Sequence, residues 1–215
     1  MENGNECMSW TDGTIETAIH QYFSHPPKLD DTSITLEKSF TAYNLESFTG
    51  IAIHWTDNIA DHLRLVEDDK KVVIFHHVTF LECQRTSLFP PGLVNETLRT
   101  ISLLFPQCDD KNRKWFKKRH FSSEIDVRLL RCGYLNHRAR EIDQFHFWKD
   151  RLIILKEKFD HAHPQTISQW WRDRRNRVQW YTFWLAVAIL ILTIFFGFVQ
   201  SVEGALQVYK AFNPN

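Results

Sequence analysis

The sequence predicts an α+β fold: a small mixed domain of helices and strands, then a long helix, then a single transmembrane helix. Short β-branched and aromatic runs stand between amphipathic stretches over the first three quarters of the chain. A run of twenty residues without a charge follows near the C-terminal end. A length of 215 residues suits one domain with an appendage, and we expect a flexible segment over 1–12 and a folded domain over 13–164.

Composition and charge argue against several classes of function. The chain has 26 basic and 26 acidic residues, so it lacks the positive excess of a dedicated nucleic-acid binder. The sequence contains no glycine-rich phosphate loop and no serine nucleophile elbow. Four cysteines without C-x-x-C spacing are typical of free thiols in a reducing compartment: Cys7, Cys83, Cys108 and Cys132. We therefore expect no nucleic-acid partner and no cofactor.

The first half of the domain predicts a helix, a strand and a second helix in that order. Residues 14–23 have helical spacing and end before a double proline. Residues 48–55 (FTGIAIHW) have strand character. Thr56 is suited to cap a helix over 57–65, whose apolar residues fall on one stripe.

The second half of the domain predicts a central strand and two further helices. After a charged turn over 67–71, residues 72–81 (VVIFHHVTFL) are apolar on both alternating faces, which is typical of a central strand. A Pro-Pro-Gly break precedes a helix over 93–105. A helix over 141–159 has a seam that is too short for a coiled coil, so we expect it to pack on its own sheet: Phe145, Trp148, Leu152, Leu155 and Phe159.

The strongest feature is the predicted transmembrane helix over 180–199, WYTFWLAVAILILTIFFGFV. A helix of this length covers about 30 Å, the thickness of a hydrocarbon core. Twelve of its residues are Leu, Ile, Val or Phe, and together they favour insertion by about 4 to 7 kcal/mol. Three residues predict an aromatic belt where the helix enters the membrane: Trp180, Tyr181 and Trp184.

The flanking charges predict the orientation. A basic juxtamembrane helix over 165–179 carries Arg172, Arg174, Arg175 and Arg177. Residues 200–215 hold one lysine and one glutamate. By the positive-inside rule we expect the domain in the cytosol and 200–215 as a short lumenal tail, which is a tail-anchored arrangement. The nearly uncharged tail favours the endoplasmic reticulum over the mitochondrial outer membrane.

Small residues recur every four positions along this helix. Such a ridge permits close approach of two helices in lipid, and it predicts a homodimer through the membrane: Thr193, Gly197, Ser201 and Ala205. Chance spacing, with the glycine easing a bend, is the alternative.

A cluster of basic residues around two aromatics stands over 111–120 (KNRKWFKKRH). It is interpreted either as a solvated helix face above two buried aromatics or as a patch that faces anionic lipid. Zero net charge and the predicted anchor weaken a nucleic-acid role. The basic residues are Lys111, Arg113, Lys114, Lys117, Lys118 and Arg119.

The eleven histidines do not predict a metal site by spacing. His76 and His77 are adjacent on the predicted strand, so we expect them to point to opposite faces and not to share an ion. The best acidic cluster, in which structural histidines are the simpler interpretation, is His54, Asp57, Asp61 and His62.

Several stretches resemble an uncharacterised family of filamentous-fungal proteins with a single C-terminal transmembrane helix. They are HWTDNIADHLRL, VVIFHHVTFL, LFPPGLVNETLRTISLLFP and the segment from Phe147 to the end. That family has no assigned activity, so the resemblance implies a fungal single-span membrane protein with a cytosolic module of unknown role.

Three functions remain open from the sequence. The leading hypothesis is a non-enzymatic binding or scaffold module that is tethered to the lipid bilayer and recognises a cytosolic protein. The first alternative is a membrane-bound hydrolase or metal-dependent enzyme that uses the cluster of His54, Asp57, Asp61 and His62. The second alternative is an accessory subunit of a transporter, because one span cannot build a pathway alone.

Overall fold

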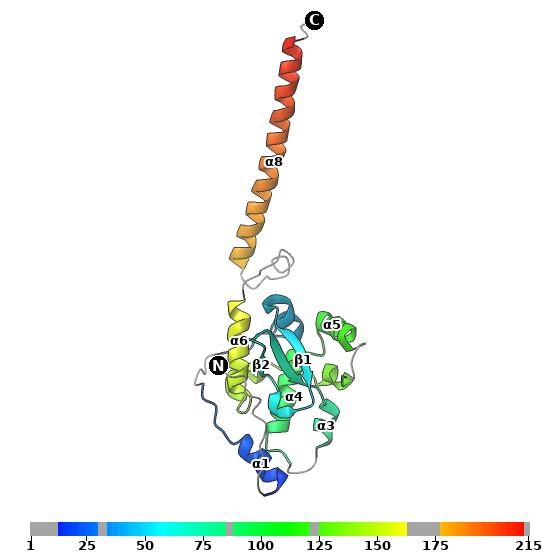
Figure 1. The fold of residues 1–215 in the computed structure, drawn as a ribbon, viewed down its shortest axis with the longest axis vertical. Coiled ribbons are helices and arrows are strands. Elements are labelled where there is room, and N and C mark those ends of the chain that lie inside the picture. The colour runs from blue at the N-terminus through cyan, green and yellow to red at the C-terminus, as the bar shows by residue number, and fades with distance from the viewer. Residues whose placement is uncertain (1–12, 30–33, 85–87, 121–124, 163–176, 213–215) are drawn as a thin grey trace. The chain divides into compact units, whose positions relative to one another are not determined.

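A computed structural model of the chain describes residues 13–29, 34–84, 88–120, 125–162 and 177–212. The chain divides into two compact units, Met1–His163 and Pro164–Asn215. The first contains a small mixed sheet surrounded by helices, and the second contains one long helix (Figure 1). The predicted α+β class is confirmed.

The sheet has three strands, β1 (Ala52–Thr56), β2 (Leu65–Val66) and β3 (Lys71–Phe75), in the order β1-β3-β2. β1 runs parallel to β3, with Thr56 opposite Phe75 at the carboxyl ends of both strands. β2 pairs with β3 in the antiparallel sense. β3 is therefore the central strand, as its two apolar faces predict, and its last four residues are all buried.

Helices and single turns of helix surround this sheet in the first unit. The longer ones are α1 (Ile15–Tyr22), α3 (Val78–Cys83), α4 (Leu93–Leu104), α5 (Asp110–His120) and α6 (Lys149–His161). The shorter ones are α2 (Ala42–Asn44), the π-helix η1 (Leu45–Thr49) and the 3-10 turns η2 (Ile59–Asp61), η3 (Val127–Arg131), η4 (Arg138–Arg140) and η5 (Ile142–Gln144). The second unit contains α8 (Arg177–Phe212).

The predicted seam is buried inside its own domain, and the phenylalanine rings it meets come from segments before the sheet, whereas the sheet was the expected packing surface. Its side chains are at most 1% exposed: Phe145, Trp148, Leu152, Leu155 and Phe159. Phe159 meets the edge of Phe40 with ring centroids 5.3 Å apart, and Trp148 meets Phe23 at 5.8 Å. Burial of each such side chain contributes about 1.5 to 3 kcal/mol. α6 is therefore a core helix with no apolar seam left over for a partner chain.

The predicted helix over 57–65 was wrong. Asn58, not Thr56, caps a single 3-10 turn, and its side chain accepts a hydrogen bond from the backbone N–H of Ala60 at 3.0 Å. Leu63 then has a left-handed backbone with φ of 62°, which ends any helix. The next residues pair with β3 as β2, so a hydrogen-bonded partner far along the chain overrides the local helical pattern.

Only the first half of the predicted strand over 72–81 is a strand in the structure. It ends at Phe75, and α3 begins at Val78. The predicted helix over 141–159 begins late, since 3-10 turns precede α6. Glu96 of α4 explains this, because its carboxylate accepts hydrogen bonds from the backbone N–H groups of His146 and Trp148, both at 2.8 Å. A side chain from another helix thus holds the segment before α6.

Candidate functional site

α8 is long and apolar enough to cross a membrane. The 30-residue stretch Trp180–Tyr209 contains an 18-residue window with a mean hydropathy of 2.5, and none of that window is buried in the protein. The helix continues well beyond the predicted span of 180–199, so most of the predicted tail is helical. Trp180 lies 5.2 Å from Tyr181 and 6.1 Å from Trp184 between ring centroids, which gathers the predicted aromatic belt at one end of α8. Three of the predicted orienting arginines lie outside the described residues: Arg172, Arg174 and Arg175.

The predicted ridge of small residues lies along α8, and each member is exposed: Thr193, Gly197, Ser201 and Ala205. A Cβ added at Gly197 would meet no atom within 4 Å, so the surface beside it is open. The hydroxyl of Thr193 donates to the carbonyl of Ile189 at 2.8 Å. Pairing of two such helices stays a prediction.

α5 carries the predicted basic cluster on an exposed face above two inward aromatics. Phe116 is buried and meets Trp55 with ring centroids 6.0 Å apart. Trp115 is half-buried, and its Nε1 donates to the carboxylate of Glu46. The exposed residues of the cluster are Lys111, Arg113, Lys114, Lys117 and Lys118, and Arg119 lies on the same helix. This arrangement is the solvated face with inward aromatics, and contact of that face with lipid stays a prediction.

The four residues of the predicted acidic cluster do not converge. Asp57 is directed to two other histidines, whereas Asp61 pairs with Arg64 at 3.1 Å. His54 is exposed on β1. His54 and Asp61 do line one surface hollow of about 260 Å³, but His62 and Asp57 do not belong to it. This dispersal removes the geometric basis for an enzyme built on the four residues.

His62 is instead a structural histidine at the centre of a buried network. Its Nδ1 accepts the backbone N–H of Phe75 at 3.2 Å, so its Nε2–H donates to the hydroxyl of Thr100 at 2.7 Å. Thr100 donates in turn to the carbonyl of Thr97 at 2.7 Å. Burial, reinforced by the charge of Arg151, lowers the pKa of His62 to about 3. The ring is therefore neutral, and both of its nitrogens are occupied.

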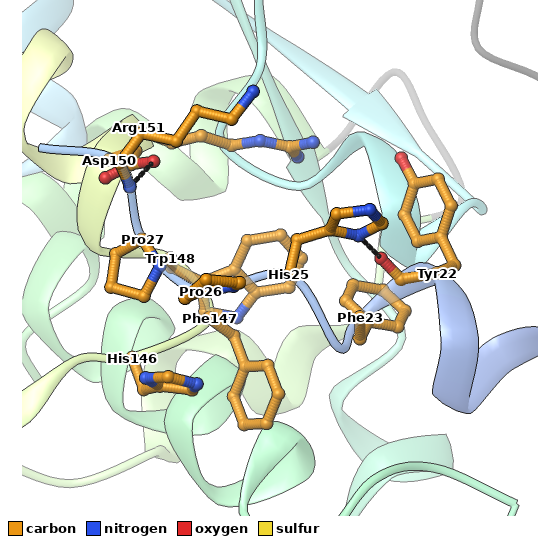
Figure 2. Close-up of a pocket in the computed structure, with 11 residues that line it drawn as sticks. Tyr22, Phe23, His25, Pro26, Pro27, His146, Phe147, Trp148, Asp150 and Arg151 are labelled. Carbon is orange, nitrogen blue, oxygen red and sulfur yellow. Dashed lines mark hydrogen bonds between the residues drawn. The ribbon is translucent and has the colours of Figure 1, made fainter.

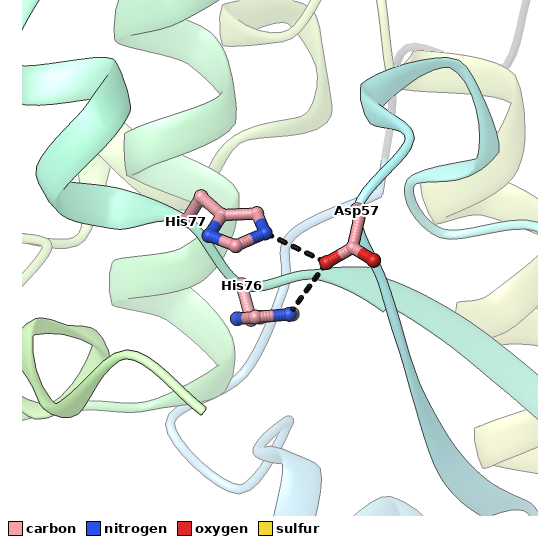
Figure 3. A group of neighbouring side chains, drawn as sticks. All are labelled: Asp57, His76 and His77. Carbon is pink, nitrogen blue, oxygen red and sulfur yellow. Dashed lines mark hydrogen bonds and ion pairs between the residues drawn. The ribbon is translucent and has the colours of Figure 1, made fainter. Parts of the chain in front are cut away.

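A different constellation gathers at the carboxyl ends of β1 and β3. Figure 3 shows His76 and His77 directing their Nε2 atoms at the same oxygen of Asp57. The distances to Oδ1 are 3.1 Å from His76 and 2.7 Å from His77, and the two rings lie 4.0 Å apart. The expectation that these histidines point to opposite faces was wrong, because β3 ends before them and the alternation of a strand no longer applies.

The electrostatics of this group follow from its unequal burial. The hydrogen bond from His77 holds the pKa of the Asp57 carboxyl below its usual range, and His76 adds to the effect. Burial lowers the pKa of His76, and the neighbouring His77 lowers it further, against the opposing charge of Asp57. His76 is 10% exposed in its side chain, whereas that of Asp57 is 84% exposed. The group thus joins an ionised surface carboxylate to a neutral, well-held imidazole.

These three residues can hold a metal ion by the criterion of distance. Their ligand atoms all lie within 4.8 Å of one another, and no other group of three histidine, cysteine, aspartate or glutamate residues in the described part of the chain meets that criterion. Sequence reasoning missed the group because it treated each strand separately. The sequence held no sufficient signal, because the ends of β1 and β3 and their parallel pairing, which bring Asp57 and His76 to one edge, are known only from the structure.

A surface pocket of about 380 Å³ lies between the segment after α1 and the start of α6 (Figure 2). Aromatic and proline side chains line much of it, among them Phe23, Pro26 and Phe147. Several of its polar groups already have partners in the protein. Asp150 accepts the backbone N–H groups of Lys28 and Leu29, at 2.8 and 3.0 Å.

Arg151 shows why this pocket is a weak candidate for an anion or substrate site. Its guanidinium donates to the carbonyls of Ala60 and His62 and lies 5.3 Å from the ring centroid of Trp148. These contacts place the positive charge against the domain's own backbone. The pocket could therefore contact a ligand mainly through its aromatic walls, because the charge of Arg151 is engaged within the protein.

Comparison of the chain with protein-family models, with curated proteins and with solved structures finds no match. The resemblance to a fungal family stays a prediction.

Proposed function

We propose that this chain is a single-pass, tail-anchored membrane protein whose domain over 13–164 is a non-enzymatic binding module in the cytosol. The observation that carries the proposal is α8, because an 18-residue window within Trp180–Tyr209 has a mean hydropathy of 2.5 and none of that window is buried in the protein. The amphipathic helix α6 differs, because its apolar side is covered by its own domain. The exposed apolar side chains of α8 would be stabilised by the hydrocarbon of a bilayer.

The flanking charges support the orientation. Arg172, Arg174, Arg175 and Arg177 precede the apolar stretch, and Lys210 is the one basic residue after it in this sequence. Such an imbalance favours retention of the arginine side in the cytosol. The endoplasmic reticulum is the proposed membrane, because the segment after the helix is nearly uncharged.

The binding role is supported by what the domain presents to solvent. It has a surface pocket with aromatic walls and an exposed basic face on α5, whereas the four residues proposed for hydrolysis are dispersed. We propose a cytosolic protein as the partner. An accessory role in a transporter would use the same anchor and would be recognised by co-purification of a multi-span subunit.

The topology can be tested with the glycosylation machinery of microsomes. A sequon appended after Asn215 should acquire a glycan, whereas the native sequon Asn95-Glu96-Thr97 should remain unmodified. Protease added outside should digest the domain and leave α8 protected. In a matched variant with the four arginines replaced by glutamine, a smaller fraction of the molecules should have the domain on the protease-accessible side. Glycosylation at Asn95 together with a protected domain would overturn the proposal.

A further inference from the structure

We propose that Asp57, His76 and His77 form a binding site for a divalent transition-metal ion of the zinc class. The ion would be held by one carboxylate oxygen and the two Nε2 atoms. This inference goes beyond the anchored binding module and does not depend on it, because it concerns the domain alone.

The first support is the position of the three residues in the fold. Thr56 and Phe75 are paired in parallel register, so Asp57 and His76 are the first residues beyond two neighbouring strand ends. In open sheets with parallel strands, ligands bind outside the carboxyl ends of those strands. The backbone N–H of Asn58 donates to the hydroxyl of Thr56 at 3.1 Å, which turns the chain directly after Asp57.

The second support is the spacing of the donor atoms. Zinc binds nitrogen and oxygen ligands at about 2.0 to 2.2 Å, so ligand atoms in a tetrahedral site lie about 3.3 Å apart. Here the Nε2 atoms lie 3.1 and 2.7 Å from Oδ1 of Asp57. Oδ1 of Asp57 would have to move a few tenths of an ångström away from the two Nε2 atoms to reach this spacing. The side chain of Asp57 is exposed and can make that movement.

The third support is the packing that holds the two imidazoles. His76 is buried, and its ring meets the indole of Trp55 edge-on with centroids 6.4 Å apart. The ring of His77 meets that of Phe75 at 5.5 Å. Both Nε2 atoms are therefore directed at Asp57 before an ion arrives, and the ordering cost of binding is reduced.

The ligand set selects the class of ion. Two imidazoles with one carboxylate suit Zn²⁺ and its neighbours such as Co²⁺ and Ni²⁺, whereas Mg²⁺ and Ca²⁺ prefer oxygen ligands alone. Three protein ligands leave a fourth position to water. The side chain of Asp57 is exposed and that of His77 is half-buried, so an ion can reach the site from solvent.

One feature limits the affinity. Binding through Nε2 places the remaining proton of His76 on Nδ1, and this atom is buried without a hydrogen-bond partner among the described residues. A metal-bound imidazole normally donates its other N–H to a carboxylate, carbonyl or water, and the lack of such a partner lowers metal affinity by about 10- to 100-fold. We therefore expect a dissociation constant of about 1 to 10 μM for Zn²⁺, which means weaker binding than at structural zinc sites.

The competing explanation is that the two histidines only donate hydrogen bonds to Asp57. The two explanations differ in what Asp57 does for an added ion, so the experiment uses full-length protein in detergent, purified with a histidine-free tag. Zn²⁺ is titrated against a chromophoric chelator, and Co²⁺ is used to report coordination through its visible absorption. We expect a single equivalent of Zn²⁺ that binds in the micromolar range and no displacement by Mg²⁺ or Ca²⁺ at about 1 mM.

The variants decide between the explanations. Asp57→Asn and His77→Asn should each weaken Zn²⁺ binding at least about tenfold and abolish the Co²⁺ absorption. The matched control His54→Asn removes another exposed histidine from β1 and should change neither measurement. Asp57 is largely exposed, so Asp57→Asn keeps the fold and decides the matter even where His77→Asn unfolds.

Two results would overturn the proposal. Zn²⁺ binding that survives Asp57→Asn unchanged would assign the ion to other histidines. Binding no tighter than about 1 mM in the parent protein would leave the group as a hydrogen-bonded pair of histidines on a carboxylate.

Discussion

The domain and α8 use the same apolar residue types in opposite ways. In the domain, Phe40, Trp148 and Phe159 are buried by neighbours that are distant in sequence. In α8, Leu190, Phe195 and Phe198 are 58 to 69% exposed. One hydrophobic surface is removed from water by tertiary packing, and the other is exposed on a helix that is long and apolar enough to cross a membrane. A mutation should therefore affect folding in the first region and membrane insertion in the second.

The largest expected effect comes from charging the middle of α8. Leu190→Arg with Ile191→Arg should raise the insertion free energy by about 6 to 8 kcal/mol, which cancels the favourable term of the whole span. We expect the double variant to be extracted from membranes by alkaline carbonate, whereas the parent stays in the pellet. The thermal transition of the domain should be unchanged. Retention of the double variant in the pellet would contradict α8 as the anchor.

The next effect concerns the domain core. Trp148→Ala should lower the free energy of unfolding by about 3 to 5 kcal/mol, because it leaves a cavity and removes the hydrogen bond from Nε1 to Thr97. Denaturant unfolding of the protein in detergent measures this loss. Trp184→Ala, the matched change on α8, should alter the domain's unfolding by less than about 0.5 kcal/mol. Equal losses from both changes would remove the distinction between the two regions.

Protonation of His62 should change the free energy of unfolding with pH, by less per pH unit than the loss expected for Trp148→Ala. The pKa of His62 is about 3 in the folded protein, against 6.5 for an unperturbed histidine in the unfolded chain. Between these two pH values the unfolded chain therefore binds more protons than the folded protein. Stability should be fully present above pH 6.5 and should fall by about 1.4 kcal/mol per unit as the pH decreases toward 4. Burial shifts His76 in the same direction.

The control for this pH dependence is His62→Gln, which should be less stable at neutral pH but should have a shallower slope between pH 4 and 6.5. Urea unfolding at several pH values gives both quantities. An unchanged slope would assign the pH dependence to groups other than His62.

The smallest effect concerns pairing of α8. Gly197→Leu should weaken dimerisation of the full-length protein in detergent by about 1 kcal/mol, because a larger side chain on the ridge keeps two backbones apart. Leu192→Ala lies on the opposite face of the helix and should have no effect on cross-linking yield. A monomeric parent, or equal cross-linking of both variants, would show that the ridge has no role in assembly.

Sequence reasoning succeeded where the pattern is contiguous. The centrality of β3, the inward seam of α6 and the apolar length of α8 were all predicted, since each follows from the spacing of residues within one segment. It failed over 57–66, where β2 pairs with β3, and at 141–148, where Glu96 holds the backbone. Both failures have the same physical origin, because a long-range hydrogen-bonding partner outweighs a weak local propensity.

The candidate site was outside the reach of such reasoning. Asp57 and His76 are nineteen positions apart, and only the parallel register of β1 and β3 brings them to one edge. The sequence by itself determined that one helix is long and apolar enough to cross a membrane, because the free energy of transfer out of water sums along contiguous residues. Only the tertiary structure decided which histidines share a carboxylate, because that depends on the pairing of two strands and on the residue where β3 ends.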